Sequence, residues 1–278
     1  LTETAAGTSN LIINVASGTT TTFTNISAGT GFTSGTDTIT INGTTGNENI
    51  TGPSNVATTL DGGDGVDTLI GGSGNDVYIF DTNDVDAGET ITDSGGSADV
   101  VAIATSVDFV NLPEANLDNI EQIRFAGANQ TGTFTGAQLT GETIALTETA
   151  AGTSNLIINV ASGVTVNFSN MTASTFTSGS DVITINASGT TNVTGPNLAT
   201  TINGGSGGDT LIGGTANDII NGLNGVDTID GGDGTDIIAS SLALTDALTA
   251  RLSNFETFVF KNVVCHTTHK YNVLKFWN

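Results

Sequence analysis

Two tracts of the chain repeat every nine residues, with glycines and an aspartate at fixed positions. The first begins at Gly62 and reads G-G-D-G-V-D-T-L-I, then G-G-S-G-N-D-V-Y-I. The second begins at Gly204 and holds four such units in unbroken register up to Ala239. Glycine permits the tight turn that the first six residues must make, and the last three residues suit a short strand. This period predicts a coil whose successive turns stack on one another.

Each nonapeptide is expected to form half a coil, so that units n and n+2 lie on the same side. Asp209 then stacks near Asp227, and Asp218 near Asp236. Carboxylates held this close repel each other, and a hard cation that accepts six or more oxygen ligands removes the repulsion. Ca²⁺ suits such a site better than Mg²⁺, which demands a stricter geometry. Zn²⁺ is disfavoured because no Cys or His lies near these turns.

The predicted ligands fall into two sets, the carboxylates at the sixth position of each unit and the turn residues at its first and third positions. The sixth-position candidates are Asp67, Asp76, Asp209, Asp218, Asp227 and Asp236. The turn candidates are Gly62, Asp64, Gly71, Ser73, Gly204, Ser206, Gly213, Thr215, Gly222, Asn224, Gly231 and Asp233. A phosphate-binding loop is the alternative for glycine-rich sequence, but no Lys-Ser/Thr follows these glycines and no βαβ pattern surrounds them.

The tracts resemble the RTX (repeats-in-toxin, hemolysin-type) calcium-binding proteins of Gram-negative bacteria, over Gly62–Ile79 and Gly204–Ala239. The resemblance implies an all-β fold, a parallel β-roll or β-solenoid with Ca²⁺ between successive turns. It implies that the sixth-position aspartates and turn carbonyls hold the ion. It also implies export by type I secretion and folding outside the cell.

The chain departs from the nonapeptide pattern in places. Leu223 replaces the second glycine of its unit and Ala216 the fourth-position glycine of another. After Ile79 the glycines are lost and Val85 stands where the aspartate belongs, so Asp84 or Asp86 is the expected substitute opposite Asp67. A weak unit from Gly43 carries Glu48 at the aspartate position, and we do not expect a metal there.

A longer repeat of about 145 residues overlies the short one, because Leu1–Gly18 is identical to Leu146–Gly163. Each copy has a Thr/Ser/Asn-rich β segment, expected to be either a β-sandwich or an extension of the solenoid. Strands are expected at 38–42, and more deeply buried ones at 11–13 and 156–158. The predicted domains are a β segment at 1–61, a roll with its capping segment at 62–145, the same pair at 146–203 and 204–260, and a tail at 261–278.

The closing segments Leu112–Phe125 and Leu242–Phe260 both have apolar residues at three-to-four spacing, then N-I/F-E and a strand-like end. We expect a short helix followed by a strand that caps the open end of the roll, because solenoid ends need covering. Glu121 and Glu256 occupy equivalent positions of the two copies and are expected to be structural rather than catalytic.

The charge excludes several partner classes. The 278 residues carry 28 acidic and 5 basic side chains, a net charge of −23. Nucleic acid would require a basic surface, and an anionic membrane would repel this chain. No stretch approaches the roughly 18 apolar residues of a membrane span, and no signal-like segment stands at the N-terminus. The chain begins at Leu1 and its single methionine is Met171, so we expect a mature piece or a fragment.

The tail from Lys261 to Asn278 differs in composition, with all three lysines, both histidines, the only cysteine and the only tryptophan. A metal site in the tail would have only three ligands, Cys265, His266 and His269, and the sequence offers no second pair to complete it. A sequence end altered by frameshift, fusion or assembly of fragments explains this tail better than a metal site.

The sequence offers no catalytic constellation, because the only histidines lie in that tail and H-E-x-x-H is absent. We therefore expect a non-enzymatic, calcium-stabilised structural module of a secreted bacterial protein, in a surface layer, sheath, matrix fibre or filament. The alternatives are the repeat region of an RTX adhesin and the C-terminal RTX portion of a secreted hydrolase. The expected location is extracellular, and the expected partner is another copy of the protein, with a cell-surface glycan as a second candidate.

Overall fold

The computed structural model describes residues 1–2, 7–33, 36–177, 180–224, 226–240, 250–261 and 274–277. The chain divides into two compact units, which are described separately. Unit 1 comprises Leu1–Gly132 and Ile144–Gly152, and unit 2 comprises Thr133–Thr143 and Thr153–Asn278.

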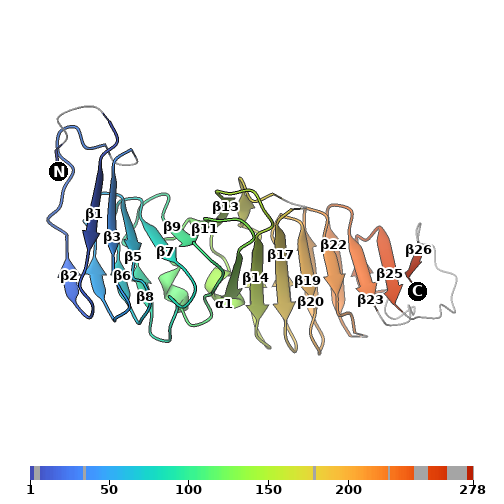
Figure 1. Cartoon of the computed structure of the whole chain (residues 1–278). Helices are drawn as coiled ribbons and strands as arrows, with labels where there is room; N and C mark the ends of the chain where they lie inside the picture. Colours follow the sequence, from blue (N-terminus) through green and yellow to red (C-terminus); the bar gives the residue numbers. More distant parts are fainter. Residues whose placement is uncertain are drawn as a thin grey trace. The chain divides into compact units, whose positions relative to one another are not determined.

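Unit 1 is a stack of coils whose strands alternate between two parallel sheets (Figure 1). The first sheet has the order β1 (Asn10–Asn14), β3 (Thr38–Asn42), β5 (Thr58–Asp61), β7 (Val77–Phe80), β9 (Val100–Ile103), β11 (Gln122–Phe125) and β13 (Ala145–Glu148). The second has the order β2 (Thr20–Thr22), β4 (Asn49–Thr51), β6 (Thr68–Ile70) and β8 (Thr90–Thr92). The consecutive nonapeptides contribute β6 to one sheet and β7 to the other, so each is half a coil as predicted.

Unit 2 repeats this arrangement. Its first sheet has the order β14 (Asn155–Val160), β17 (Val182–Ala187), β19 (Thr200–Asn203), β21 (Ile219–Asn221), β23 (Ile237–Ser240), β25 (Thr257–Lys261) and β26 (Leu274–Trp277). Its second has the order β15 (Thr165–Asn167), β18 (Asn192–Thr194), β20 (Thr210–Gly214), β22 (Thr228–Gly232) and β24 (Leu252–Ser253). The other elements are β10 (Val107–Asp108), the 3₁₀ turn η1 (Glu114–Asn116), β12 (Thr131–Thr135), α1 (Gly136–Leu139) and β16 (Thr172–Ala173).

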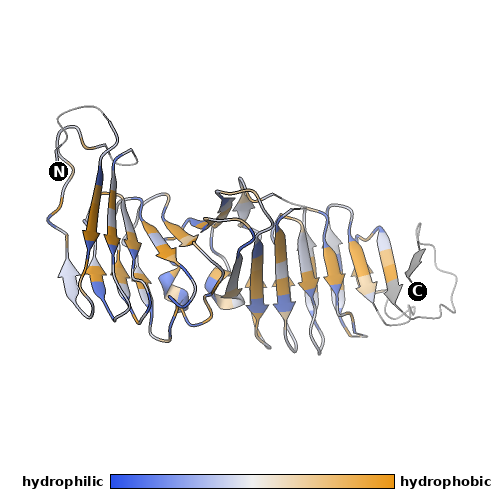
Figure 2. Ribbon diagram, in the orientation of Figure 1, coloured by the Kyte–Doolittle hydropathy of each residue, from blue (hydrophilic) through white to orange (hydrophobic). Residues whose placement is uncertain are grey.

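Columns of apolar side chains, one from each coil, form the core. In-register parallel pairing places equivalent residues directly above one another, and Figure 2 shows the apolar bands along the strands. The column of the first sheet in unit 1 is Ile13, Ile41, Leu60, Tyr78, Val101, Ile123 and Leu146. The matching column in unit 2 is Ile158, Ile185, Ile202, Ile220, Ile238 and Phe258. Tyr78 is fully buried in a column that is otherwise aliphatic in its unit.

The Thr-rich segments extend the solenoid, which decides between the two folds expected for them. β3 pairs in parallel with β5 of the first RTX tract, and β17 pairs in the same way with β19. Thr-rich strands and RTX strands therefore belong to one continuous stack within each unit.

The identical strand sequence N-L-I-I-N is buried differently in the two units. Leu156 and Ile158 of β14 are fully buried, but Ile12 of β1 is 62% exposed and Leu11 and Ile13 are half-buried. The prediction of a deeply buried strand is thus wrong for β1, which is the end strand of its sheet. In unit 2, helix α1 contacts β14 and begins with a capping box at Thr135.

The closing segment of copy 1 ends only one of the two sheets. η1 contacts β8, the last strand of the second sheet, and Asn116 Oδ1 accepts the Ile91 backbone N–H at 2.9 Å. β11 then pairs with β9 on one side and β13 on the other, so the first sheet continues past it. The predicted cap over the end of the roll is therefore only partly correct, because the segment covers the end of the second sheet and continues the first. In copy 2, the helix expected in 242–249 lies outside the described residues.

Candidate calcium sites

Acidic side chains at the sixth positions stack along each unit and hold the coils together. In unit 2 the Asp209 N–H donates to Asp227 Oδ1 at 2.9 Å, and the Asp218 N–H donates to Asp236 Oδ1 at 2.8 Å. Each acid therefore binds the backbone of the coil below through one carboxylate oxygen. The predicted pairing of units n and n+2 is confirmed.

Unit 1 has the same arrangement, although its sequence there is less regular. The Asp67 N–H donates to Glu89 Oε2 at 2.7 Å, and the Asp76 N–H to Asp99 Oδ1 at 2.6 Å. The Asp99 N–H donates in turn to Glu121 Oε2 at 2.8 Å. Glu256 accepts the Asp236 N–H at 2.7 Å, so both glutamates of the closing segments end such a series, in agreement with the structural role expected for them.

We call this arrangement the carboxylate ladder. Its members are Glu48, Asp67 and Glu89; Asp76, Asp99 and Glu121; Asp209 and Asp227; and Asp218, Asp236 and Glu256. Glu89, and not Asp84 or Asp86, stands opposite Asp67. Sequence reasoning missed Glu89 and Asp99. The signal that could have identified them is an acidic residue directly before the first residue of a strand. Glu89 precedes Thr90 and Asp99 precedes Val100, whereas the distance from the preceding glycines is misleading here.

The second oxygen of several ladder carboxylates has no hydrogen-bond partner although it is buried. These atoms are Asp67 Oδ2, Asp99 Oδ2, Asp209 Oδ2, Asp218 Oδ2 and Asp236 Oδ2. A buried, unpaired carboxylate oxygen is costly unless a cation meets it. Hard oxygen donors of this kind are the ligands that Ca²⁺ takes in proteins. The donor set therefore fits the ion.

Glycine at the first position of a unit leaves room for that oxygen. A Cβ at Gly213 would lie 2.5 Å from Asp218 Oδ2 and would also collide with the Gly231 carbonyl. A Cβ at Gly231 would lie 2.7 Å from Asp236 Oδ2. The glycines thus allow a carboxylate and a carbonyl of successive coils to approach the same space.

Burial shifts the carboxyl groups of Asp67, Asp76, Glu89, Asp99 and Asp218 toward their protonated form. Desolvation, opposed by backbone N–H bonds, raises the pKa of Asp67 and of Asp76 to about 6. It raises the pKa of Asp99 and of Asp218 to about 7. Desolvation and the neighbouring Asp67 charge raise the pKa of Glu89 to about 8. A divalent ion would lower all of these values by compensating the buried charge.

The structure brings the predicted sixth-position residues together and distributes the turn residues over two environments. All six sixth-position aspartates are buried. The first-position glycines Gly62, Gly71, Gly213 and Gly231 are buried, Gly204 is half-buried, and Gly222 is exposed. The third-position residues Asp64, Ser73, Ser206, Thr215 and Asp233 are exposed, whereas Asn224 is half-buried. Two sixth-position aspartates differ from the others, because their second carboxylate oxygen also accepts a backbone N–H. Asp227 Oδ2 accepts the Asn224 N–H, and Asp76 Oδ2 accepts the Gly72 N–H.

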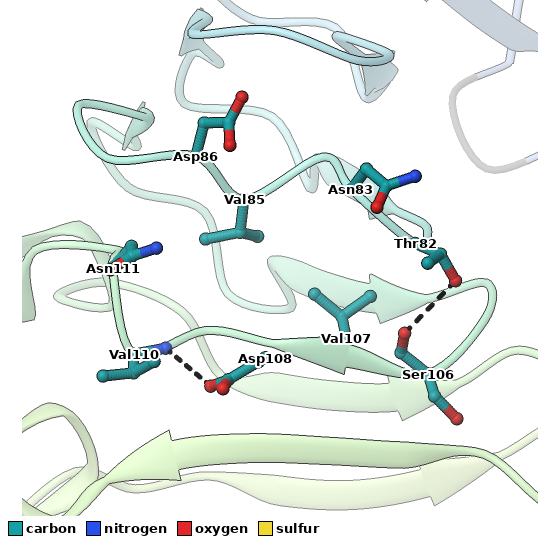
Figure 3. A pocket seen from close by; sticks show the side chains of 9 residues that line it. All are labelled: Thr82, Asn83, Val85, Asp86, Ser106, Val107, Asp108, Val110 and Asn111. Atoms are coloured by element: carbon teal, nitrogen blue, oxygen red, sulfur yellow. Dashed lines mark hydrogen bonds between the residues drawn. The ribbon is translucent and has the colours of Figure 1, made fainter.

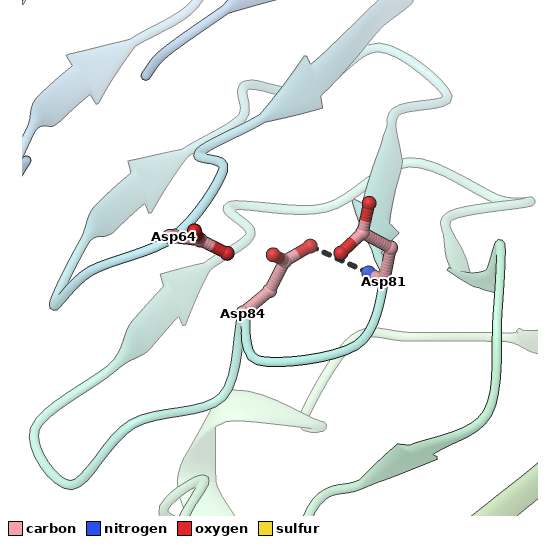
Figure 4. Close-up of side chains that lie close together, drawn as sticks. All are labelled: Asp64, Asp81 and Asp84. Atoms are coloured by element: carbon pink, nitrogen blue, oxygen red, sulfur yellow. Dashed lines mark hydrogen bonds between the residues drawn. The ribbon is translucent and has the colours of Figure 1, made fainter. Parts of the chain in front are cut away.

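A second acidic group lies beside the ladder at the outer turns of unit 1. Asp64, Asp81 and Asp84 each place a carboxylate oxygen within 4.8 Å of the others (Figure 4). Asp84 is buried and accepts the Asp81 N–H, while Asp64 and Asp81 are exposed. Desolvation raises the pKa of Asp84 to about 7. This group includes one of the third-position residues predicted as ligands.

A model of the RTX calcium-binding nonapeptide repeat matches the chain in four copies, at residues 57–82 and 203–238. The chain carries RTX calcium-binding repeats. These RTX segments contain the six sixth-position aspartates of the ladder, and they bind Ca²⁺. No curated protein and no solved structure matches the chain.

The RTX repeats define a calcium-binding repeat module of a secreted protein, and RTX-repeat proteins are typically secreted. Asp209, Asp218 and Asp236 would hold ions through their unpaired oxygens. The bound ion would supply positive charge between stacked coils. Of the helices in the described part of the chain, none has the length and apolar character that a membrane span needs.

A groove of about 390 Å³ opens on unit 1 (Figure 3). Its lining includes Thr82, Asp86, Ser106 and Asp108. The Thr82 hydroxyl donates to the Ser106 carbonyl at 3.4 Å, and the Val110 N–H donates to Asp108 Oδ1 at 3.1 Å. The nine described residues that line it include no histidine, cysteine, lysine or arginine.

Proposed function

We propose that the chain is a calcium-stabilised structural module of an extracellular bacterial assembly, such as a surface layer, sheath, matrix fibre or filament. The observation that carries the proposal is the carboxylate ladder with its unpaired buried oxygens, because it makes the cohesion of the coils depend on the ion. Extracellular calcium modules bind at ~10⁻⁴–10⁻³ M. The module would therefore remain unloaded in a cytosol and would fold fully after type I secretion.

Tandem construction supports a scaffold. Both units place Thr-rich strands and RTX strands in one continuous stack, and stacked repeats build extended regular structures. The partner we propose is another copy of the protein. A cell-surface glycan is the second candidate, and neither nucleic acid nor membrane insertion suits the net charge of −23.

The role we propose is non-enzymatic. The ladder carboxylates are engaged with backbone N–H groups, and the lining of the groove at Thr82–Asn111 has no basic side chain to act beside Asp86 and Asp108. An adhesin in which these repeats space out a binding domain is the second candidate, favoured by the tandem copies. A binding domain encoded beside these repeats in the full gene would favour the adhesin.

The test is chelation of the purified protein. Exhaustive EGTA treatment should loosen the coils, seen by circular dichroism, and should release subunits from any assembly, seen by electron microscopy. Restoring millimolar Ca²⁺ should reverse both changes, and Mg²⁺ at the same concentration should not. Unchanged spectra and an unchanged assembly state after chelation would refute the proposal.

A further inference from the structure

Three buried carboxylates surround one space where the first RTX tract meets the coil that follows it. Asp76, Asp93 and Asp99 each place an oxygen within 4.8 Å of the other two. Their exposed fractions are 0%, 8% and 0%. Asp76 is the sixth residue of a recognised repeat, whereas Asp93 and Asp99 lie beyond residue 82, where the match to the RTX repeat ends.

The geometry points to a cation site and not to an accidental gathering of acids. Asp99 Oδ2 is fully buried and has no hydrogen-bond partner. The hydrogen bonds that the cluster accepts come from neutral donors, namely the N–H groups of Thr58, Gly72, Asp76 and Gly95 and the Tyr78 hydroxyl. Three carboxylates thus share a buried space that these neutral donors do not neutralise.

The separations of the carboxylate oxygens are compatible with one shared calcium ion. Calcium–oxygen bonds of about 2.3–2.6 Å allow two ligands of one ion to stand at most about 4.6–5.2 Å apart. A Cβ at Gly96 would come within 2.8 Å of both Asp99 carboxylate oxygens and 2.5 Å of the Gly74 carbonyl oxygen. The missing side chain therefore leaves a carboxylate and a carbonyl facing the same gap.

Tyr78 and Asp93 form a pair that the second copy lacks. The Tyr78 hydroxyl donates to Asp93 Oδ2 at 2.8 Å and accepts the Gly71 N–H at 3.0 Å. Strand register aligns Tyr78 with Leu60 as it aligns Ile220 with Ile202. Asp93 comes directly after Thr92, which pairs with Ile70. Gly231 comes directly after Asp230, which pairs with Ile212, so Gly231 is the equivalent of Asp93 in unit 2. Unit 2 thus replaces the pair by Ile220 and Gly231 together.

We infer that Asp76, Asp93 and Asp99 form a three-carboxylate Ca²⁺ site, closed by Tyr78, where the last nonapeptide of the first tract meets the coil beyond the recognised RTX repeats. Calcium affinity rises with ligand charge and site rigidity. This site therefore binds Ca²⁺ more tightly than the two-carboxylate position at Asp218 and Asp236. It anchors the irregular coil from Asp81 to Asp99 onto the last nonapeptide of the first tract.

The first experiment is calorimetric titration of the full chain with Ca²⁺. The Asp93→Asn variant should lose the tightest class of sites, with an affinity at least about tenfold lower for one ion. Asp118→Asn is the matched control, because Asp118 is an exposed acid of the same unit, and it should leave the isotherm unchanged. An Asp93→Asn isotherm equal to that of the parent chain would overturn the inference.

The second experiment uses Tb³⁺, a hard cation whose luminescence a nearby phenol sensitises. The full chain excited through tyrosine should show sensitised emission that Ca²⁺ competes away, and Tyr78→Phe should lose most of it while keeping the buried ring. Emission equal to that of the parent chain in Tyr78→Phe would contradict the site.

Should Asp93→Asn fail to fold, the double change Tyr78→Ile with Asp93→Gly recreates the pair that unit 2 already accommodates. It should fold and still lack the tightest class of sites. Retention of that class in the double variant would also overturn the inference. Because each readout is ion binding by the dissolved protein, failure here is distinct from failure of the proposed scaffold role.

Discussion

At the scale of the residue, the ladder aspartates that have an unpaired oxygen perform two tasks with their two oxygens. Asp218 Oδ1 accepts the Thr200 N–H at 2.8 Å, while Asp218 Oδ2 is buried and unpaired. One oxygen therefore fixes the register of neighbouring coils, and the other is available to an ion. Two substitutions can separate the two tasks.

Asp218→Asn keeps a hydrogen-bond acceptor for Thr200 but removes the charge. We expect it to reduce the gain in stability on adding Ca²⁺ and to leave stability in EGTA unchanged or higher. Asp218→Ala should also destabilise the EGTA form by about 1–3 kcal/mol, because it leaves a buried N–H unpaired. Urea unfolding with and without Ca²⁺ measures both effects. The control is Asp233→Asn, at an exposed turn position. Equal behaviour of Asp218→Asn and Asp218→Ala would contradict the division of tasks.

The raised pKa values give the calcium-free protein an unusual pH dependence. The folded chain keeps protons on Asp67 and Asp76 up to about pH 6, on Asp99 and Asp218 to about pH 7, and on Glu89 to about pH 8. The unfolded chain releases them near the ordinary values of 3.8 for Asp and 4.5 for Glu. Because the folded state binds more protons in this window, its stability falls as the pH rises.

In EGTA, the free energy of unfolding should therefore decrease from about pH 4 to about pH 8. In saturating Ca²⁺ the ion replaces the protons, so the decrease should be absent and the stabilisation by Ca²⁺ should grow with pH. Urea unfolding at pH 5 and pH 8 under both conditions provides the measurement. Stability that rises with pH in EGTA would show that these carboxylates are not protonated in the folded state.

At the scale of the element, the regular nonapeptides allowed prediction from sequence and the irregular coil did not. Spacings of 18 residues place Asp209 below Asp227 and Asp218 below Asp236. In unit 1 the corresponding spacings are 22 residues to Glu89 and 23 to Asp99. Counting from the glycines fails there because the longer turn, which carries Asp81 and Asp84, absorbs the extra residues. Strand register, which only the structure gives, identifies the acids that complete the ladder.

The burial of the strands was a second feature that the sequence could not predict. Identical residues at 10–14 and 155–159 end up exposed or buried according to what covers them, and local pattern carries no information about that. For the same reason, the sequence did not decide whether the Thr-rich strands form a β-sandwich or extend the solenoid. Alternation reports one buried face without showing which strand lies alongside.

An asparagine ladder supports the outer face of unit 2. Asn221 Nδ2 donates to Asn203 Oδ1 at 3.0 Å, Asn203 Nδ2 to Asn186 Oδ1 at 2.8 Å, and Asn186 Nδ2 to Asn159 Oδ1 at 3.2 Å. Asn203→Ala removes two of these bonds, so we expect a loss of about 0.5–1.5 kcal/mol for each. Thr201→Ala, on the same face of β19, is the control. Urea unfolding in saturating Ca²⁺ is the measurement, and equal losses for both variants would refute a specific role for the ladder.

At the scale of the whole molecule, the charge makes the ion an energetic requirement. A net charge of −23 opposes compaction. The ladder concentrates part of that charge in buried columns, where solvent screens it poorly. Calcium binds the folded form, which alone brings these oxygens together, and so shifts the folding equilibrium. The amount of stabilisation therefore reports how many ions fold with the chain.

The free energy of unfolding should increase with the logarithm of the Ca²⁺ concentration, by about 1.4 kcal/mol per tenfold increase for each ion bound on folding. A slope equivalent to several ions is expected, because unpaired ladder oxygens occur in both units, at Asp67 and Asp99 and at Asp209, Asp218 and Asp236. Urea unfolding over a series of buffered Ca²⁺ concentrations gives the slope. NaCl of equal ionic strength is the control for screening, and it should stabilise the EGTA form without reproducing the slope. A slope of zero would mean that the buried carboxylates are satisfied without the ion, and cohesion of the coils would then have to come from the apolar columns alone.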